Sequence, residues 1–171
     1  TMNFVDVKTS DYFYDSVKWA VNDNITKGTS ATTFSPNNTC TRAEIVTFLW
    51  RAAGSPTPTI TRNPFRDVNA VSHSSYYKAI LWASQKGITS GTSATAFSPD
   101  QVCTRAQIVT FLYRYAGQPS GYYSNPFKDV GATSEASYYN AILWAVGKGI
   151  TTGTSATTFS PYASCNRAEA V

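Results

Sequence analysis

The feature that most constrains this fold is an internal repeat of about 62 residues. Cys40, Cys103 and Cys165 stand 63 and 62 positions apart, and each directly precedes Thr-Arg-Ala or Asn-Arg-Ala. The stretch 25–51 is identical to the stretch 88–114 at 20 of 27 positions. A period of this length indicates one supersecondary unit used several times, with each unit burying its apolar face against a neighbour. We therefore expect three copies, at 1–61, 62–123 and 124–171, which together form one structural unit.

Each copy predicts a helix, a loop and a second helix. In the second copy, apolar residues recur at helical spacing over 76–84, and Lys86-Gly87 marks the end of that helix. The Gly/Ser/Thr-rich stretch 28–36 of the first copy predicts an ordered loop with at most a small hairpin. A second helix is expected over 42–53, with Gly54 just beyond it. The fold class is therefore all-α.

A capping motif precedes the second helix in every copy. Thr41 stands three positions before Glu44, the spacing at which a side-chain hydroxyl and a carboxylate each bond the other residue's backbone N–H. The other copies keep this arrangement with allowed substitutions. The expected helix-capping residues are Thr41 with Glu44, Thr104 with Gln107, and Asn166 with Glu169.

An arginine in the first helical turn is unexpected, because a cation there faces the positive end of the helix dipole. Arg42, Arg105 and Arg167 nevertheless occupy this position in all three copies. Two explanations are open. The arginines form ion pairs with the repeated aspartates, or they converge with free helix N–H groups on an anion such as a carboxylate or phosphate. The repeated aspartates are Asp6, Asp67 and Asp129.

Composition argues against several functions. Charged residues make up 14% of the chain, and the net charge of +4 comes from lysines and arginines scattered singly, so a nucleic-acid partner is not expected. No apolar run is long enough to cross a membrane, and no targeting segment is visible at the start of the sequence. Aromatic residues make up another 14%, which excludes a disordered chain.

The sequence also offers no catalytic or metal site. An odd number of cysteines excludes a fully paired disulfide framework, and no metal-ligand spacing surrounds them, so we expect buried thiols. His73 is the only histidine and has no catalytic partner motif, which indicates a helix-entry or surface role. We expect neither a cofactor nor enzymatic activity.

The ordered motifs identify a family. Phe-x-Asp-Val, Tyr-x-x-Ala-Ile, Gly-Ile-Thr, Phe-Ser-Pro and Thr-Arg-Ala-Glu, in this order, closely resemble S-layer homology repeats over nearly the whole chain except its connectors. The resemblance implies a pseudo-threefold, all-helical spindle. The second helices would form a central bundle, and the first helices would lie on outer prongs. It also implies non-covalent attachment of a bacterial surface protein to the cell wall.

The resemblance makes Arg42, Arg105 and Arg167 the main contacts to an acidic sugar, in grooves between the repeats. Other expected carbohydrate-binding residues recur beside them: Asp6, Asp67, Asp129, Gly28, Gly91, Gly153, Tyr12, Tyr76 and Tyr138. Trp19, Trp82 and Trp144 lie within the first helices and are expected in the core. The third copy stops at Val171, equivalent to Val46, so we expect a further segment or another chain to complete it.

From these residues we expect a non-catalytic module that binds an acidic, pyruvylated secondary cell-wall polysaccharide. It would lie outside the cell, in the wall or surface layer of a Gram-positive-type bacterium. Protein–protein contact or adhesion within a surface assembly is the alternative. We expect Arg105→Ala to weaken wall binding while leaving the fold intact.

Overall fold

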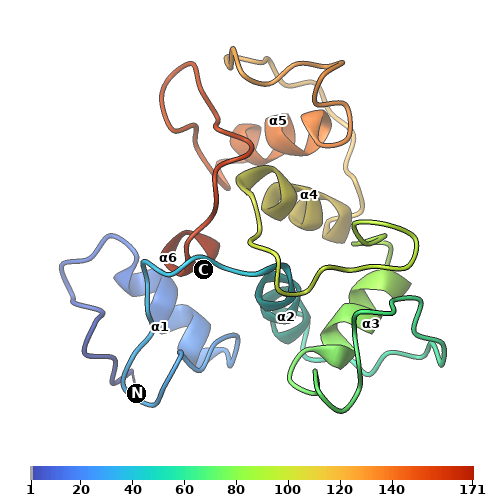
Figure 1. The fold of residues 1–171 in the computed structure, drawn as a ribbon. Coiled ribbons are helices and arrows are strands. Elements are labelled where there is room, and N and C mark those ends of the chain that lie inside the picture. Colours follow the sequence, from blue (N-terminus) through green and yellow to red (C-terminus); the bar gives the residue numbers. More distant parts are fainter. Residues whose placement is uncertain (1) are drawn as a thin grey trace.

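The computed structural model describes residues 2–171; Thr1, the first residue of the predicted first copy, lies outside the described residues. Figure 1 shows three lobes around a common centre. Within the described part the only β-structure is three isolated bridges, so the all-α class with three repeats is confirmed. The helices are α1 (Tyr14–Asn22), α2 (Arg42–Ala52), α3 (Tyr77–Gln85), α4 (Arg105–Tyr115), α5 (Tyr139–Gly147) and α6 (Arg167–Ala170).

Helix packing crosses the boundaries between copies. Helix α2 packs on α3, and α4 packs on α5, so a lobe combines the second helix of one copy with the first helix of the next (Figure 1). The α6 helix beside α1 has only four residues. Trp82 on α3 and Trp144 on α5 are therefore 3% and 7% exposed, as predicted for core residues. The same prediction is wrong for Trp19, which is 51% exposed because no comparable helix covers it.

The three cysteines form the centre of the molecule. The backbone N–H of Cys40 donates to the carbonyl of Cys165 at 2.9 Å, that of Cys103 to Cys40 at 2.8 Å, and that of Cys165 to Cys103 at 3.2 Å. This ring of hydrogen bonds ties the three copies together. All three thiols are free and buried, as predicted, and burial raises their pKa to about 12.

Each Gly/Ser/Thr-rich loop is anchored by the aspartate of its own copy. The Asp67 carboxylate accepts the backbone N–H groups of Phe97 at 2.9 Å and Ser98 at 2.8 Å, and Asp6 and Asp129 make the same pair of bonds in their copies. The phenylalanine held in this way is fully buried in every copy. At the start of the loop, a Cβ on Gly28 would lie only 2.6 Å from the ring of Phe4, so this position requires glycine.

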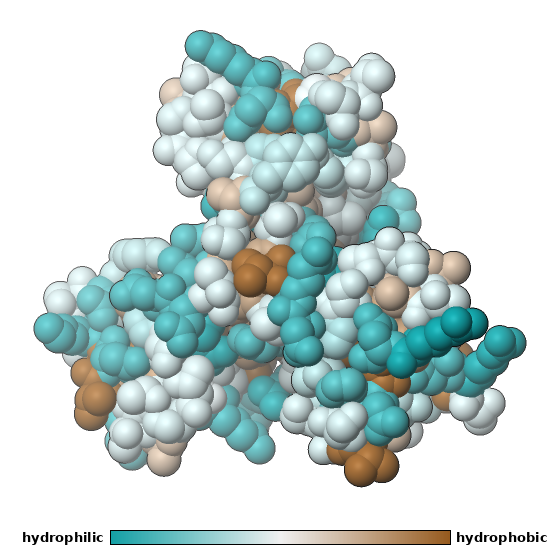
Figure 2. Space-filling view, in the orientation of Figure 1, coloured by the Kyte–Doolittle hydropathy of each residue, from teal (hydrophilic) through white to brown (hydrophobic). Residues whose placement is uncertain are grey.

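The surface carries little charge, as the composition indicates. Figure 2 shows a face that is mostly of intermediate hydropathy, with hydrophobic residues in small separate groups and notches between the lobes. Large hydrophobic side chains that are exposed include Tyr12, Trp19, Val71 and Tyr122. Within residues 2–171, no helix combines the length and the apolar character that a membrane span needs.

Candidate functional site

The repeated arginine joins each copy to the next one. Its side chain extends from the first position of the second helix, donates a hydrogen bond from Nε to a backbone carbonyl, and lies over the ring of the phenylalanine that supplies this carbonyl. The Nε–O distances are 3.0 Å for Arg42 to Phe97, 2.9 Å for Arg105 to Phe159 and 2.7 Å for Arg167 to Phe34. The distances from the guanidinium carbon to these ring centroids are 4.8, 4.6 and 4.8 Å. The unusual first-turn cation is thus explained by an interlock between copies.

The N–H groups at the helix start are not free for an anion. In α2, the N–H of Arg42 donates to the carbonyl of Gln101 at 2.9 Å, and that of Ala43 to the carbonyl of Pro99 at 3.0 Å. The N–H of Glu44 donates to the Thr41 hydroxyl at 3.2 Å. The prediction that free N–H groups at the helix start would help to bind an anion is therefore wrong, because these groups already have protein acceptors. Any anion site here depends on side chains.

Pairing of the arginines with the repeated aspartates is also wrong, because those carboxylates are engaged by the loop backbone. In the described part of the chain, the arginines pair instead with glutamates from the third helical position of the following copy. Arg167 Nη1 lies 3.0 Å from Glu44 Oε2, and Arg105 Nη1 lies 4.0 Å from Glu169 Oε2. Arg42 has no such partner, because the equivalent residue is the neutral Gln107.

The predicted N-caps are present on all three second helices. Thr41, Thr104 and Asn166 each accept the N–H of the residue three positions on. Only Gln107 also completes the reciprocal half of the box, since its Oε1 accepts the N–H of Thr104 at 3.0 Å. Glu44 instead pairs with Arg167. The last residue of the capping motif therefore has two different roles, capping its own helix in one copy and pairing with an arginine of another copy in the other two.

Three cavities lie beside the arginines, where consecutive copies meet. Their volumes are about 300 Å³ beside Arg42, 340 Å³ beside Arg105 and 200 Å³ beside Arg167. Every cavity combines the arginine of one copy with a Thr-x-Gly segment and the third helical residue of the next. The lining glycines are Gly91, Gly153 and Gly28, respectively, so the structure brings all the predicted arginines and glycines together in pairs.

The remaining predicted residues are distributed unevenly. Tyr138 lines the Arg42 cavity and Tyr76 lines the Arg167 cavity, so each of these two cavities is built from three copies. Tyr12 is 80% exposed and lies in none of the three cavities. The residue equivalent to Tyr76 and Tyr138 at the helix entry is Phe13. The three aspartates likewise line none of the three cavities.

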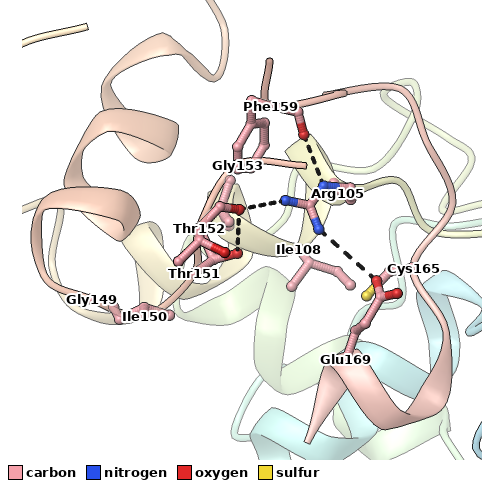
Figure 3. A pocket seen from close by; sticks show the side chains of 11 residues that line it. Arg105, Ile108, Gly149, Ile150, Thr151, Thr152, Gly153, Phe159, Cys165 and Glu169 are labelled. Carbon is pink, nitrogen blue, oxygen red and sulfur yellow. Dashed lines mark hydrogen bonds and ion pairs between the residues drawn. The ribbon is translucent and has the colours of Figure 1, made fainter. Parts of the chain in front are cut away.

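Figure 3 shows the Arg105 cavity from close by. The guanidinium lies between Phe159 on one side and Glu169 on the other, and its Nη2 donates to the carbonyl of Thr152 at 2.8 Å. All three nitrogens of this side chain therefore face protein acceptors. The cavity beside it is lined by Gly149–Gly153 and Ile108.

Two further cations were not predicted as site residues. Arg51 and Arg114, on the last turns of α2 and α4, line the Arg167 and Arg42 cavities. Each donates from Nη1 to a backbone carbonyl at 3.2 Å, Arg51 to Ile25 and Arg114 to Ile88. Arg51 and Arg114 end the two similar stretches 25–51 and 88–114, and this repetition was the sequence signal that could have identified them as site residues. Burial lowers the pKa of Arg42 below its usual value, and Arg114 nearby lowers it further.

Comparison with known proteins shows the family of this chain. The S-layer homology domain pattern matches at 3–46, 64–109 and 126–171, and the chain belongs to this family. Domains of this family are non-catalytic modules that anchor proteins at the cell surface by binding cell-wall polymers.

Two curated proteins are similar in sequence. The chain is 32% identical over 111 residues to an endoglucanase of Bacillus sp. (strain KSM-635), and 31% identical over 105 residues to a surface-layer 125 kDa protein of Lysinibacillus sphaericus. The matches cover 65% and 61% of this chain but only 11% and 9% of those proteins. The chain thus corresponds to about a tenth of the length of these relatives.

Proposed function

We propose that the chain binds an acidic secondary cell-wall polysaccharide, one that carries pyruvylated sugars, in the cavities between its copies. The observation that carries the proposal is the repeated cavity itself, in which an arginine faces a hollow lined by backbone, hydroxyl and aromatic groups. A guanidinium recognises a carboxylate through paired N–H donors. Threonine hydroxyls at all three cavities, and tyrosine rings at the Arg42 and Arg167 cavities, supply polar and apolar contacts for a sugar.

Family membership and the similarity to a surface-layer protein support the proposal. An endoglucanase among the relatives supports the idea that one anchoring module serves proteins of different activities, since the matched segment is a small part of each protein. The chain would act outside the cell, in the wall or surface layer, and hold a larger protein there. Its repeats at 1–61, 62–123 and 124–171 would act together, because every cavity needs more than one copy.

The test is a binding assay with purified secondary wall polysaccharide from a Gram-positive-type bacterium, prepared with its pyruvyl groups and after their removal. We expect binding to the intact polymer and at least about tenfold weaker binding to the treated one, as the loss of charge-assisted contacts predicts. Equal binding to both would contradict an acid-dependent site. No binding to either would favour the alternative, contact with another protein, for which exposed Trp19 on α1 offers a surface.

A further inference from the structure

The Arg42 cavity differs from the other two in its unpaired polar atoms. Among the described residues, two buried side-chain nitrogen or oxygen atoms lack a hydrogen-bond partner, Arg42 Nη2 and the Tyr138 hydroxyl. Both residues line this one cavity. Arg42 is only 3% exposed, and the one hydrogen bond of its side chain in the described part of the chain is the Nε bond to Phe97. Buried polar atoms are nearly always satisfied, so two unpaired ones at one cavity indicate a place built for a ligand.

A single residue explains why the arginine of this cavity has no carboxylate partner. Arg167 and Arg105 each face a glutamate of the next copy, which neutralises the cavity arginine from within the protein. The residue that stands at this position for Arg42 is Gln107, whose side-chain oxygen accepts a bond from the Thr104 N–H. Arg114 adds a second cation, and no carboxylate lines this cavity. The Arg167 cavity is also lined by further cations, Lys27 and Arg51, so a second cation is not what sets the Arg42 cavity apart. What distinguishes it is the lack of a carboxylate in its lining, which leaves the Arg42 guanidinium to attract an anion from outside.

We propose that the Arg42 cavity is the principal binding site for the anionic group of the glycan, and that Gln107 makes it so by leaving Arg42 unneutralised. The Glu44 and Glu169 carboxylates act as internal counter-ions that compete with ligand in the other two cavities. This inference rests on the proposed function and refines it to one site of three. A carboxylate or phosphate oxygen would accept from Arg42 Nη2, and a sugar oxygen would pair with the Tyr138 hydroxyl.

The decisive variant is Gln107→Glu, because glutamate is already tolerated at the equivalent position of both other copies and the cap is retained. Gln85→Glu is its matched control, since it adds the same charge at an exposed position of α3 that lines none of the three cavities. The probe is a wall oligosaccharide with one acidic terminal sugar, titrated by calorimetry. We expect one site per wild-type chain, at least about tenfold weaker binding for Gln107→Glu, and a change below about threefold for Gln85→Glu.

The converse variant tests the role of the glutamates. The Arg167 cavity also contains a tyrosine, Tyr76, so Glu44→Gln should release its arginine and raise the stoichiometry from one site toward two. In Gln107→Glu combined with Glu44→Gln, binding should move to the Arg167 cavity. Thermal unfolding of each variant establishes that it is folded.

The outcomes separate the two proposals. If the wild type binds the acidic oligosaccharide and folded Gln107→Glu binds it equally well, the assignment of the Arg42 cavity is overturned while the proposed function stands. If the wild type binds neither the acidic oligosaccharide nor the polymer, both proposals fail. A repeat with a phosphorylated oligosaccharide in place of the carboxylated one distinguishes the two kinds of anion.

Discussion

The interlock made by the repeated arginines predicts that Arg105→Ala destabilises the protein. The substitution removes the Nε bond to Phe159 at 2.9 Å, the Nη2 bond to Thr152 at 2.8 Å and the ring contact at 4.6 Å. A hydrogen bond from a charged donor contributes about 1.5–3 kcal/mol and a cation–π contact about 0.5–2 kcal/mol. The Thr152 bond is exposed, and the Arg105–Glu169 ion pair is long at 4.0 Å with the Glu169 side chain 37% exposed, so these two interactions contribute little stability. We expect the free energy of unfolding to fall by about 3 kcal/mol.

Urea denaturation followed by tryptophan fluorescence measures this change. For a chain of this size, a loss of about 3 kcal/mol corresponds to a melting temperature lower by roughly 6–12 °C. Arg105→Lys should recover little of it, because a lysine has no planar fork to reach the two carbonyls. Arg66→Ala is the control, since Arg66 is exposed and its side chain forms no hydrogen bond or ion pair in the described part. A loss below about 0.5 kcal/mol for Arg105→Ala would refute the interlock.

Three further predictions follow from the caps, the unpaired hydroxyl and the thiols. Thr104→Ala should lower the free energy of unfolding, measured by urea denaturation, by about 0.5–2 kcal/mol, because it removes an N-cap. Its effect on glycan affinity should be smaller than that of Gln107→Glu. Loss of binding at full stability would instead make the hydroxyl a direct ligand. Tyr138→Phe removes an unpaired buried hydroxyl, so the free protein should be equally stable or about 1–3 kcal/mol more stable. The same substitution should weaken glycan binding. A clear loss of stability would show that the hydroxyl has a hydrogen-bond partner in the free protein. Burial raises the pKa of Cys40, Cys103 and Cys165 from 9.0 to about 12, so the native protein at pH 8 should react with a thiol reagent only as fast as it unfolds. For the same reason the free energy of unfolding should fall as the pH rises from about 9 to 12. Rapid labelling of the folded protein would contradict the burial of the three thiols.

Much of the fold is predictable from the sequence because its signals are local. The second helix is predicted at 42–53 and observed at Arg42–Ala52, since a capping threonine and a following glycine mark both ends. Asn24 has a φ of 60°, the left-handed conformation in which an asparagine can follow the end of a helix. The repeated positions of the candidate site could be recognised because a residue that recurs in three copies can be distinguished from chance, even when no other sequence is compared.

Contacts between copies could not be predicted in the same way. Trp19 and Trp82 occupy equivalent positions in similar helices, yet one is exposed and the other buried, because burial depends on the helix that the next lobe supplies. The interlock was hidden for the same reason, since nothing local indicates that Arg42 reaches Phe97, 55 positions away. Arg105→Ala was therefore expected to leave the fold intact, whereas the contacts of Arg105 with the next copy predict a loss of stability.

The candidate site was partly predicted from the sequence. The glutamine at position 107, where the other two copies have glutamate, was visible in the sequence but its effect on the site was not recognised. The three arginines and three glycines do meet in cavities, whereas Tyr12 and the aspartates do not. Gln107 was interpreted as an equivalent substitute for glutamate in a capping box, which is correct for the helix. Its larger consequence concerns the charge beside an arginine of the preceding copy, and this becomes apparent only when the copies are placed in space.

The relay of contacts from each copy to its neighbour also has an evolutionary consequence. After a gene triplication the cavities between the copies begin alike, and each cavity is formed by more than one copy. A point mutation in one copy, such as a change between glutamate and glutamine at position 107, then alters a single cavity through the arginine of its neighbour. Duplicated sites can in this way diverge in ligand preference one at a time, while the conserved arginine ring continues to hold the molecule together.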